Sequence, residues 1–200
     1  SPDAVSFDAT RGAYFNRKSG LIMSGGQLDV YGVSAYGASG AASEATDSMT
    51  VCLELMPTMN RNTLFTTIFA HGTTDFVLHF HAYFDYLSIL VGGTEVKPFL
   101  LTRHLASPPM NEWTQVCAVA SANHDARLYV NGTLVAVSRD ARLPTRSYSE
   151  GQPPMFVIGA SLDQNWHNRI GSNRGFGGYM RHVKQFSREL LESEIEQVFL

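Results

Sequence analysis

Apolar and polar positions alternate along this chain in short runs that are separated by turn-forming residues. Period-two alternation is typical of half-buried β-strands, and many short strands at close spacing favour a sandwich or a barrel. The pattern predicts strands at residues 4–8, 12–15, 49–56, 64–70, 76–81, 84–91, 113–121, 126–131, 133–138, 155–159 and 177–184.

Two of these runs show clearly which side faces the core. Their apolar alternate positions are Val51, Leu53, Leu55, Val116, Ala118 and Ala120. The opposite faces are mixed, and they carry Cys52 in the first run and Cys117 in the second. Since a strand presents successive side chains to opposite faces, we expect the apolar sides to pack in the core and both cysteines to lie outside it.

A tight hairpin and one short helix complete the pattern. Asn131-Gly132 stands between two alternating runs, and this pair tolerates the positive φ angles of a type I′ turn. Residues 191–200 place their apolar side chains on one side and their charges on the other, which predicts a C-terminal helix. We find no internal repeat and no linker, so residues 1–200 are predicted to form a single domain.

Composition narrows the class of protein. The chain has 200 residues, of which 44% are hydrophobic and 16% charged, with a net charge of −3. This balance implies no polyanionic partner, so nucleic acid binding is not expected. The sequence has no run of 18 apolar residues that would insert in a membrane. It begins Ser-Pro-Asp-Ala-Val, which is not a signal peptide, so a secreted form would have lost its signal.

Several segments follow the order found in pentraxins. They are Thr50-Val51-Cys52-Leu53, Thr67-Ile68-Phe69-Ala70, Leu87-Ser88-Ile89-Leu90-Val91-Gly92-Gly93, Trp113-Thr114-Gln115-Val116-Cys117, Leu128-Tyr129-Val130-Asn131-Gly132, Phe156-Val157-Ile158-Gly159 and Phe176-Gly177-Gly178. The chain thus resembles pentraxin and laminin-G-like domains over nearly its whole length. One departure is Val119, which stands where the pentraxin signature has a tryptophan.

This resemblance implies a fold and a setting. The fold is all-β, a two-sheet antiparallel β-sandwich of the concanavalin A-like jelly-roll type with a short C-terminal helix. The setting is extracellular, either secreted or within the ectodomain of a larger adhesion protein or receptor. The implied partner is a protein or a glycan, and a homo-oligomer is compatible with the family.

The resemblance also implies a disulfide between Cys52 and Cys117. Both cysteines lie on the mixed faces of strands that this fold places side by side. Two free, buried cysteines are the alternative, whereas a metal pair would need further Cys or His at zinc spacing.

Calcium is the cofactor that the family suggests, and most of its ligands are missing here. Aligning Ile158-Gly159 with the pentraxin strand leaves only Asp75, Asp163 and Asn173 at ligand positions. Calcium takes six to eight oxygen ligands, so these three residues are either the remainder of a degenerate calcium site or ordinary polar loop residues.

A second metal candidate is His79-Phe80-His81. On a strand the two histidines share a face with Val77 and could supply two zinc nitrogens, with His71 or Asp85 as a third ligand. The alternative is a pair of solvated or hydrogen-bonded histidines on an exposed sheet face.

The loop at residues 161–175 carries the predicted ligand-binding residues. It combines amides, charges and one large ring, the mixture that sugars and protein partners require. The candidates are Asp163, Asn165, Trp166, His167 and Arg169. A loop whose Trp166 packs against its own neighbours is the alternative.

Asn131-Gly132-Thr133 matches the N-glycosylation acceptor pattern, and the same residues are explained by the turn alone. No strand shows the alternating carboxylates of a glycosidase, and Glu54 and Asp85 stand alone on their strands. We therefore predict a non-catalytic extracellular recognition module. A calcium-dependent lectin is the second hypothesis, and a glycoside hydrolase on the same fold is the third.

Overall fold

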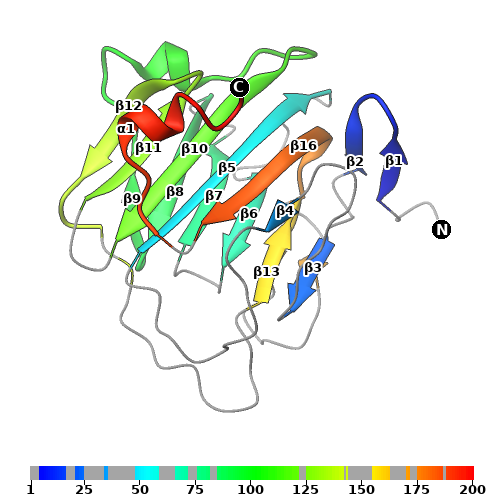
Figure 1. Cartoon of the computed structure of the whole chain (residues 1–200), viewed down its shortest axis with the longest axis horizontal. Helices are drawn as coiled ribbons and strands as arrows, with labels where there is room; N and C mark the ends of the chain where they lie inside the picture. Colours follow the sequence, from blue (N-terminus) through cyan, green and yellow to red (C-terminus); the bar gives the residue numbers. More distant parts are fainter. Residues whose placement is uncertain are drawn as a thin grey trace.

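The computed structural model describes most of the chain as two stacked β-sheets with one short α-helix near the C-terminus (Figure 1). The described residues are 5–16, 21–24, 34–35, 48–58, 66–71, 76–81, 85–121, 125–141, 143, 155–162, 170–171, 175–186 and 188–200. All strand pairs named within the two sheets are antiparallel except β4 with β16. The predicted fold class, an antiparallel β-sandwich with a C-terminal helix, is confirmed.

The eight-stranded sheet has the order β1-β2-β16-β5-β10-β11-β12, and β4 pairs with β16. Its strands are β1 (Ser6–Asp8), β2 (Gly12–Asn16), β4 (Ser34–Ala35), β5 (Ser48–Pro57), β10 (Thr114–Ser121), β11 (Ala126–Val130), β12 (Thr133–Ser138) and β16 (Gly177–Phe186). Strands distant in sequence therefore become neighbours, since β16 lies between β2 and β5.

The six-stranded sheet has the order β3-β13-β6-β7-β8-β9 and lies behind the first sheet in the view of Figure 1. Its strands are β3 (Leu21–Ser24), β6 (Thr66–His71), β7 (Phe76–His81), β8 (Tyr86–Val91), β9 (Thr94–Val96) and β13 (Met155–Ile158). A separate ribbon pairs β14 (Ser161–Leu162) with β15 (Ile170–Gly171).

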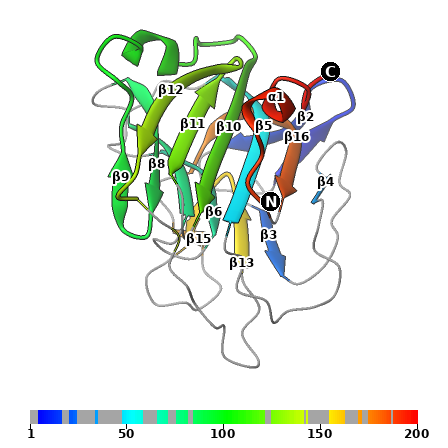
Figure 2. The same cartoon turned by 60° about the vertical axis from the view of Figure 1, so that its left-hand side comes forward.

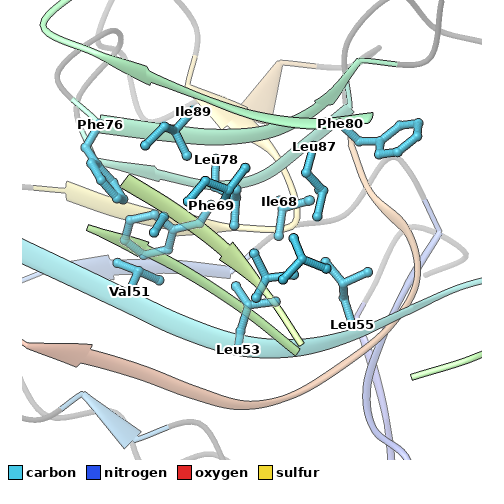
Figure 3. Packing of buried hydrophobic residues seen from close by; sticks show 14 of the residues in the cluster. Val51, Leu53, Leu55, Ile68, Phe69, Phe76, Leu78, Phe80, Leu87 and Ile89 are labelled. Carbon is cyan, nitrogen blue, oxygen red and sulfur yellow. The ribbon is translucent and has the colours of Figure 1, made fainter. Parts of the chain in front are cut away.

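The core fills the space between the two sheets with the alternate side chains of both (Figure 3). Val51, Leu53 and Leu55 of β5 are buried there, and they face Leu78 of β7 and Ile89 of β8. The predicted core residues of β10 are equally buried, so the facing inferred from alternation is confirmed for both strands.

Every run predicted as a strand overlaps an observed strand, and the hairpin turn is also confirmed. Asn131 and Gly132 have φ angles of 48° and 75°, as the type I′ turn between β11 and β12 requires. The pattern missed β3, β4, β9, β14 and β15, which are too short for alternation to show, and the 3₁₀ turn η1 (Arg103–Ala106).

The C-terminal helix is shorter than predicted. Helix α1 covers only Glu192–Ile195, and turns continue from there to Phe199. The backbone bonds explain this difference, because Gln197, Val198 and Leu200 donate to the carbonyl three residues earlier rather than four. Helix α1 lies on the outer face of the eight-stranded sheet (Figure 2).

Candidate functional site

The outer face of the eight-stranded sheet is divided into a covered half and an open half. In the covered half, Cys52 of β5 opposes Cys117 of β10, and the two form the predicted disulfide. The C-terminal segment, residues 188–200, packs over this bridge with Leu190, Ile195, Val198 and Phe199. The prediction that both cysteines lie on non-core faces is confirmed, and the bridge is buried by this second apolar cluster.

A polar row crosses the sheet beside the disulfide. The register places Arg181 of β16 opposite Glu54 of β5, and Glu54 opposite Gln115 of β10. Glu54 accepts hydrogen bonds from Arg181 Nε at 2.5 Å, His182 Nδ1 at 2.8 Å and Gln115 Nε2 at 3.3 Å. Gln115 in turn donates its backbone N–H to Asn131 Oδ1 at 2.9 Å, which joins the row to the hairpin turn.

Glu54 is held ionised by this row. Burial by itself raises the pKa of Glu54, but the hydrogen bonds from Arg181, His182 and Gln115 outweigh it and leave the pKa below its usual value. The Glu54 side chain is only 9% exposed. A carboxylate that is paired and ionised in this way is unsuited to donate a proton as a general acid at neutral pH.

An aromatic row occupies the open half of the same face. The Arg181 guanidinium lies 4.0 Å from the centre of the Trp113 ring. Tyr179 of β16 opposes Tyr14 of β2, with ring centres 4.9 Å apart, and Arg11 lies 5.5 Å from the Tyr179 ring. Aromatic rings alternating with cations can contact the apolar face and the hydroxyl groups of a sugar.

A pocket of about 350 Å³ separates the hairpin turn from the C-terminal segment. Asn131 and Thr133 line it on the side of the turn, and Phe199 and Glu196 line it on the side of the C-terminal segment. We call it the hairpin pocket. Its volume lies near the lower end of the range for small-ligand sites, roughly 300–1,000 Å³.

The six-stranded sheet carries a hydrogen-bonded cluster on its outer face. Ser88 Oγ lies 2.8 Å from His79 Nε2 and donates to Glu95 Oε1 at 3.1 Å. Glu95 Oε1 also lies 3.7 Å from His79 Nε2, so the three polar groups form one hydrogen-bonded cluster.

The same cluster lowers the pKa of Glu95 to about 2, first through its hydrogen bond with His79 and then through Lys97 and Ser88. The sequence suggested that His79 is either solvated or hydrogen-bonded on an exposed sheet face. The side chain is hydrogen-bonded, but it is only 6% exposed, so the expectation of an exposed face is wrong for His79. His79 points away from the core, whereas Phe76, Leu78 and Phe80 of the same strand belong to it.

An ordered loop between β9 and β10 exposes large apolar side chains. We call residues 97–111 the apolar loop. Leu100 and Leu101 are 84% and 86% exposed, and Phe99, Leu105 and Met110 are also exposed. Several exposed apolar side chains within one short segment make that segment a candidate interaction surface.

The apolar loop is nevertheless firmly attached to the sandwich. Val135 O of β12 accepts hydrogen bonds from Phe99 N at 2.9 Å and from Thr102 Oγ1 at 3.1 Å. Arg103 lies 4.5 Å from the ring centre of Tyr86, and Ala106 is fully buried. The exposure of Leu100 and Leu101 is therefore a property of the ordered fold.

The structure brings together only some of the predicted site residues. Asn131 lies in the hairpin turn and lines the hairpin pocket. The side chains of His71 and His81 are not described, although both residues are in strands. The candidates outside the described residues are Asp75, Asp163, Asn165, Trp166, His167, Arg169 and Asn173.

The metal predictions remain predictions. Among the residues that the structure describes, no three His, Cys, Asp or Glu side chains are grouped so that they could hold a metal ion. Asp85, considered as a third zinc ligand, accepts a hydrogen bond from Ser107 Oγ at 2.9 Å. No helix in the described part of the chain is long and apolar enough to cross a membrane.

Sequence reasoning missed the polar row and the apolar loop. Glu54 looked isolated because Arg181 and His182, its partners, are far away in sequence and lie on β16. The apolar loop had a visible signal in Phe99-Leu100-Leu101, three large apolar residues in succession after a proline and outside any predicted strand.

Comparison with solved structures finds the same fold at low identity. A heptameric SAP-like pentraxin from Limulus polyphemus matches with a TM-score of 0.59 and 16% identity, covering 76% of this chain and 69% of that one. Domain 4 of AbnA, a GH43 extracellular arabinanase from Geobacillus stearothermophilus solved with arabinotriose, matches with a TM-score of 0.57 and 15% identity, over 97% and 79% of the two chains.

A third match is the Trypanosoma rangeli sialidase solved with sialic acid. It has a TM-score of 0.60 and 16% identity, and the match covers 95% of this chain but 27% of the sialidase. The likeness therefore concerns only part of that enzyme. No curated protein sequence matches the chain significantly.

A laminin-G-type family model, described as the concanavalin A-like lectin/glucanases superfamily, matches residues 32–196. This range covers most of the chain, and its limits include strands of both sheets and helix α1. The chain therefore belongs to the concanavalin A-like lectin/glucanase superfamily, with a laminin-G- and pentraxin-like jelly roll.

Proposed function

We propose that this chain is a non-catalytic recognition module of an extracellular protein and that its apolar loop is the surface on which a partner protein docks. The observation that carries the proposal is the exposure of Leu100 and Leu101 on an ordered loop. Fully burying a leucine contributes roughly 1.5–3 kcal/mol, so the two side chains offer a substantial part of a binding free energy.

The charges around the apolar loop indicate the chemistry of the partner. Arg103 and His104 lie in the loop, whereas Lys97 is paired with Glu95 at 3.2 Å. A partner with an apolar socket and a carboxylate facing Arg103 and His104 would complement this surface, which favours a protein over a neutral sugar. Because the loop is already ordered, little conformational entropy is lost when the partner binds.

The carboxylates of the two outer sheet faces support a non-catalytic role. A glycosidase needs one carboxyl group to give a proton and another to act opposite it across the scissile bond. Glu54 is engaged by Arg181 and His182, and Glu95 by His79 and Lys97. Neither acid is available for proton donation near neutral pH.

The disulfide supports an extracellular setting. Such bridges form and persist in secreted proteins and cell-surface ectodomains, and they are rare in the reducing cytosol. Cys52 and Cys117 are also sealed beneath the C-terminal segment, which is the arrangement of a structural bridge rather than a redox-active one.

A binding screen against cell-surface proteins tests the proposal. The double variant Leu100→Ser, Leu101→Ser should lose at least about 30-fold in affinity for the partner that the wild type selects, which corresponds to roughly 2 kcal/mol. The matched control is Leu191→Ser, a leucine that is 64% exposed in the C-terminal segment. If the double variant binds as well as this control, the apolar loop is not the docking surface.

Glycan binding is the second candidate function, and the aromatic row favours it. The superfamily is named for lectins and glucanases, and the arabinanase domain was solved with arabinotriose. A glycan array with wild type and Tyr179→Ala would identify sugars that stack on the Tyr14–Tyr179 pair. Binding that survives Tyr179→Ala would point instead to the predicted loop at residues 161–175.

The calcium-dependent lectin is a variant of this second candidate. Anything that binds only the folded state raises its stability, so calcium should raise the melting temperature if Asp75, Asp163 and Asn173 form a site. Melts in calcium and in chelator that coincide would oppose the lectin and leave the protein-binding module.

A further inference from the structure

The hairpin pocket begins at the residue that the sequence marks as a glycan acceptor. Asn131 and Thr133, the first and third residues of the acceptor pattern, both line it and are both exposed. The opposite wall consists of the C-terminal segment, including Phe199 and Glu196. A group attached to Asn131 would therefore stand at the edge of the space between the hairpin and the C-terminal segment.

The geometry of Asn131 is compatible with attachment. Its Oδ1 accepts the backbone N–H of Gln115 at 2.9 Å, which directs the carbonyl side of the carboxamide toward β10. Glycosylation uses the other atom, Nδ2, and keeps the carbonyl, so this hydrogen bond can persist in the modified protein. In the transfer, Nδ2 loses one proton and bonds to the anomeric carbon of a lipid-linked oligosaccharide, and the lipid diphosphate leaves with the electrons of the broken C–O bond.

The chemistry of the pocket suits the first sugar of such a glycan. Phe199 offers ring surface to the apolar face of a hexose, and Gln115 and Glu196 offer hydrogen-bonding groups to its hydroxyl or acetamide groups. A sugar tethered at Asn131 has an effective concentration in the millimolar range, so even weak contacts are populated. Because the sugar is covalently attached beside the pocket, it would occupy the pocket in preference to a free sugar at lower concentration.

We infer that Asn131 is N-glycosylated and that the first N-acetylhexosamine of its glycan occupies the hairpin pocket. There the sugar links the β11–β12 turn to the C-terminal segment. Cys117 also lines the pocket and is 2% exposed, so the Cys52–Cys117 bridge is buried before any sugar is added. The inference rests on the proposed extracellular setting, because only chains that enter the secretory pathway receive this modification.

The test uses the chain secreted from eukaryotic cells. Thr133→Ala removes the acceptor pattern while keeping Asn131 and its hydrogen bond, and Thr133→Ser keeps the pattern as the matched control. Mass spectrometry measures occupancy, and hydrogen exchange measures protection of the C-terminal segment. We expect amides at residues 195–200 to exchange about fivefold faster in Thr133→Ala than in wild type, with Thr133→Ser matching wild type.

Enzymatic trimming identifies which sugar matters. An endoglycosidase that leaves a single N-acetylglucosamine on Asn131 should preserve protection, whereas an amidase that removes the whole glycan should abolish it. An unoccupied Asn131, or equal protection of wild type and Thr133→Ala, would overturn the inference.

Failure here is distinguishable from failure of the proposed function. Partner binding that depends on Leu100 and Leu101 is measured on the Thr133→Ala protein, which carries no glycan at this position. If that binding persists while exchange is unchanged, only the glycan inference is lost. If secreted protein is fully glycosylated but shows no loop-dependent partner, only the docking surface is lost.

Discussion

Two segments outside the sheets carry large apolar residues, and they differ in which of these residues they bury. The C-terminal segment buries Leu190 and Ile195 against the disulfide and exposes Leu191 and Leu200. The apolar loop leaves Leu100 and Leu101 in solvent and buries Ala106 instead. Both segments are ordered and both are anchored by hydrogen bonds, so the difference is not one of flexibility.

The hydrogen bonds that attach the C-terminal segment and the apolar loop to the sheets differ in position. Thr50 of β5 is fully buried, and its hydroxyl donates to Arg188 O at 2.8 Å and accepts from Leu190 N at 3.0 Å. These bonds pull the C-terminal segment down onto the sheet. The bonds from Phe99 and Thr102 to Val135 fix only the two ends of the exposed turn and present the leucines between them. We therefore interpret the first segment as structural and the second as a recognition surface.

Removing the disulfide tests the structural side of this comparison and should have the largest effect. The bridge closes a sequence separation of 65 residues. In the chain-entropy model the double variant Cys52→Ala, Cys117→Ala should therefore lose about 4 kcal/mol of unfolding free energy. Urea denaturation with linear extrapolation measures it. An unchanged midpoint would mean that the apolar cluster over the bridge carries the stability by itself.

Truncating Ile195 should have the next largest effect. Its side chain is almost fully buried in the cluster that covers the bridge, so Ile195→Ala should cost about 2–4 kcal/mol. Leu101→Ala should change the unfolding free energy by less than about 0.5 kcal/mol, because the leucine has no buried contacts to lose. Equal losses of unfolding free energy in Ile195→Ala and Leu101→Ala would contradict the interpretation of one segment as structural and the other as a recognition surface.

Acid should weaken the base of the apolar loop through Glu95. Its pKa is depressed to about 2 in the fold, so its contribution is present above the unfolded value near 4.5 and is lost as the pH falls toward 2. Because Glu95 is partly exposed, we expect the contribution to be on the order of 1 kcal/mol. Glu95→Gln should reduce the drop in stability between pH 5 and pH 2 relative to wild type, roughly by that amount. A drop of the same size in both proteins would contradict the assignment.

Most of the sandwich was accessible from the sequence because alternation reports directly which side of a strand is buried. Val51, Leu53 and Leu55 face the core for that reason, and Cys52 beside them does not. The strands that escaped prediction are two to four residues long, and β4 and β15 have only two residues each. A period of two cannot be read from so few positions.

The surface features were less accessible because they depend on pairing between distant strands. Glu54 and Arg181 become neighbours only when β16 joins the sheet beside β5, and the bulge between Arg181 and Lys184 brings His182 to the same carboxylate. The hairpin pocket likewise needs the C-terminal segment to fold back over β10 and β11. The predicted binding loop at 161–175 lies mostly outside the described residues, so its candidates remain predictions.

Hydrogen exchange on a complex with a partner selected by the wild-type chain tests the central claim most directly. The measurement compares amide protection in the apolar loop with that in the C-terminal segment, with and without partner. We predict that binding slows amide exchange at residues 99–105 by at least tenfold, which corresponds to about 1.4 kcal/mol. Exchange at residues 188–200 should stay unchanged. Protection that appears at 161–175 or over the aromatic row, with residues 99–105 unaffected, would contradict the account.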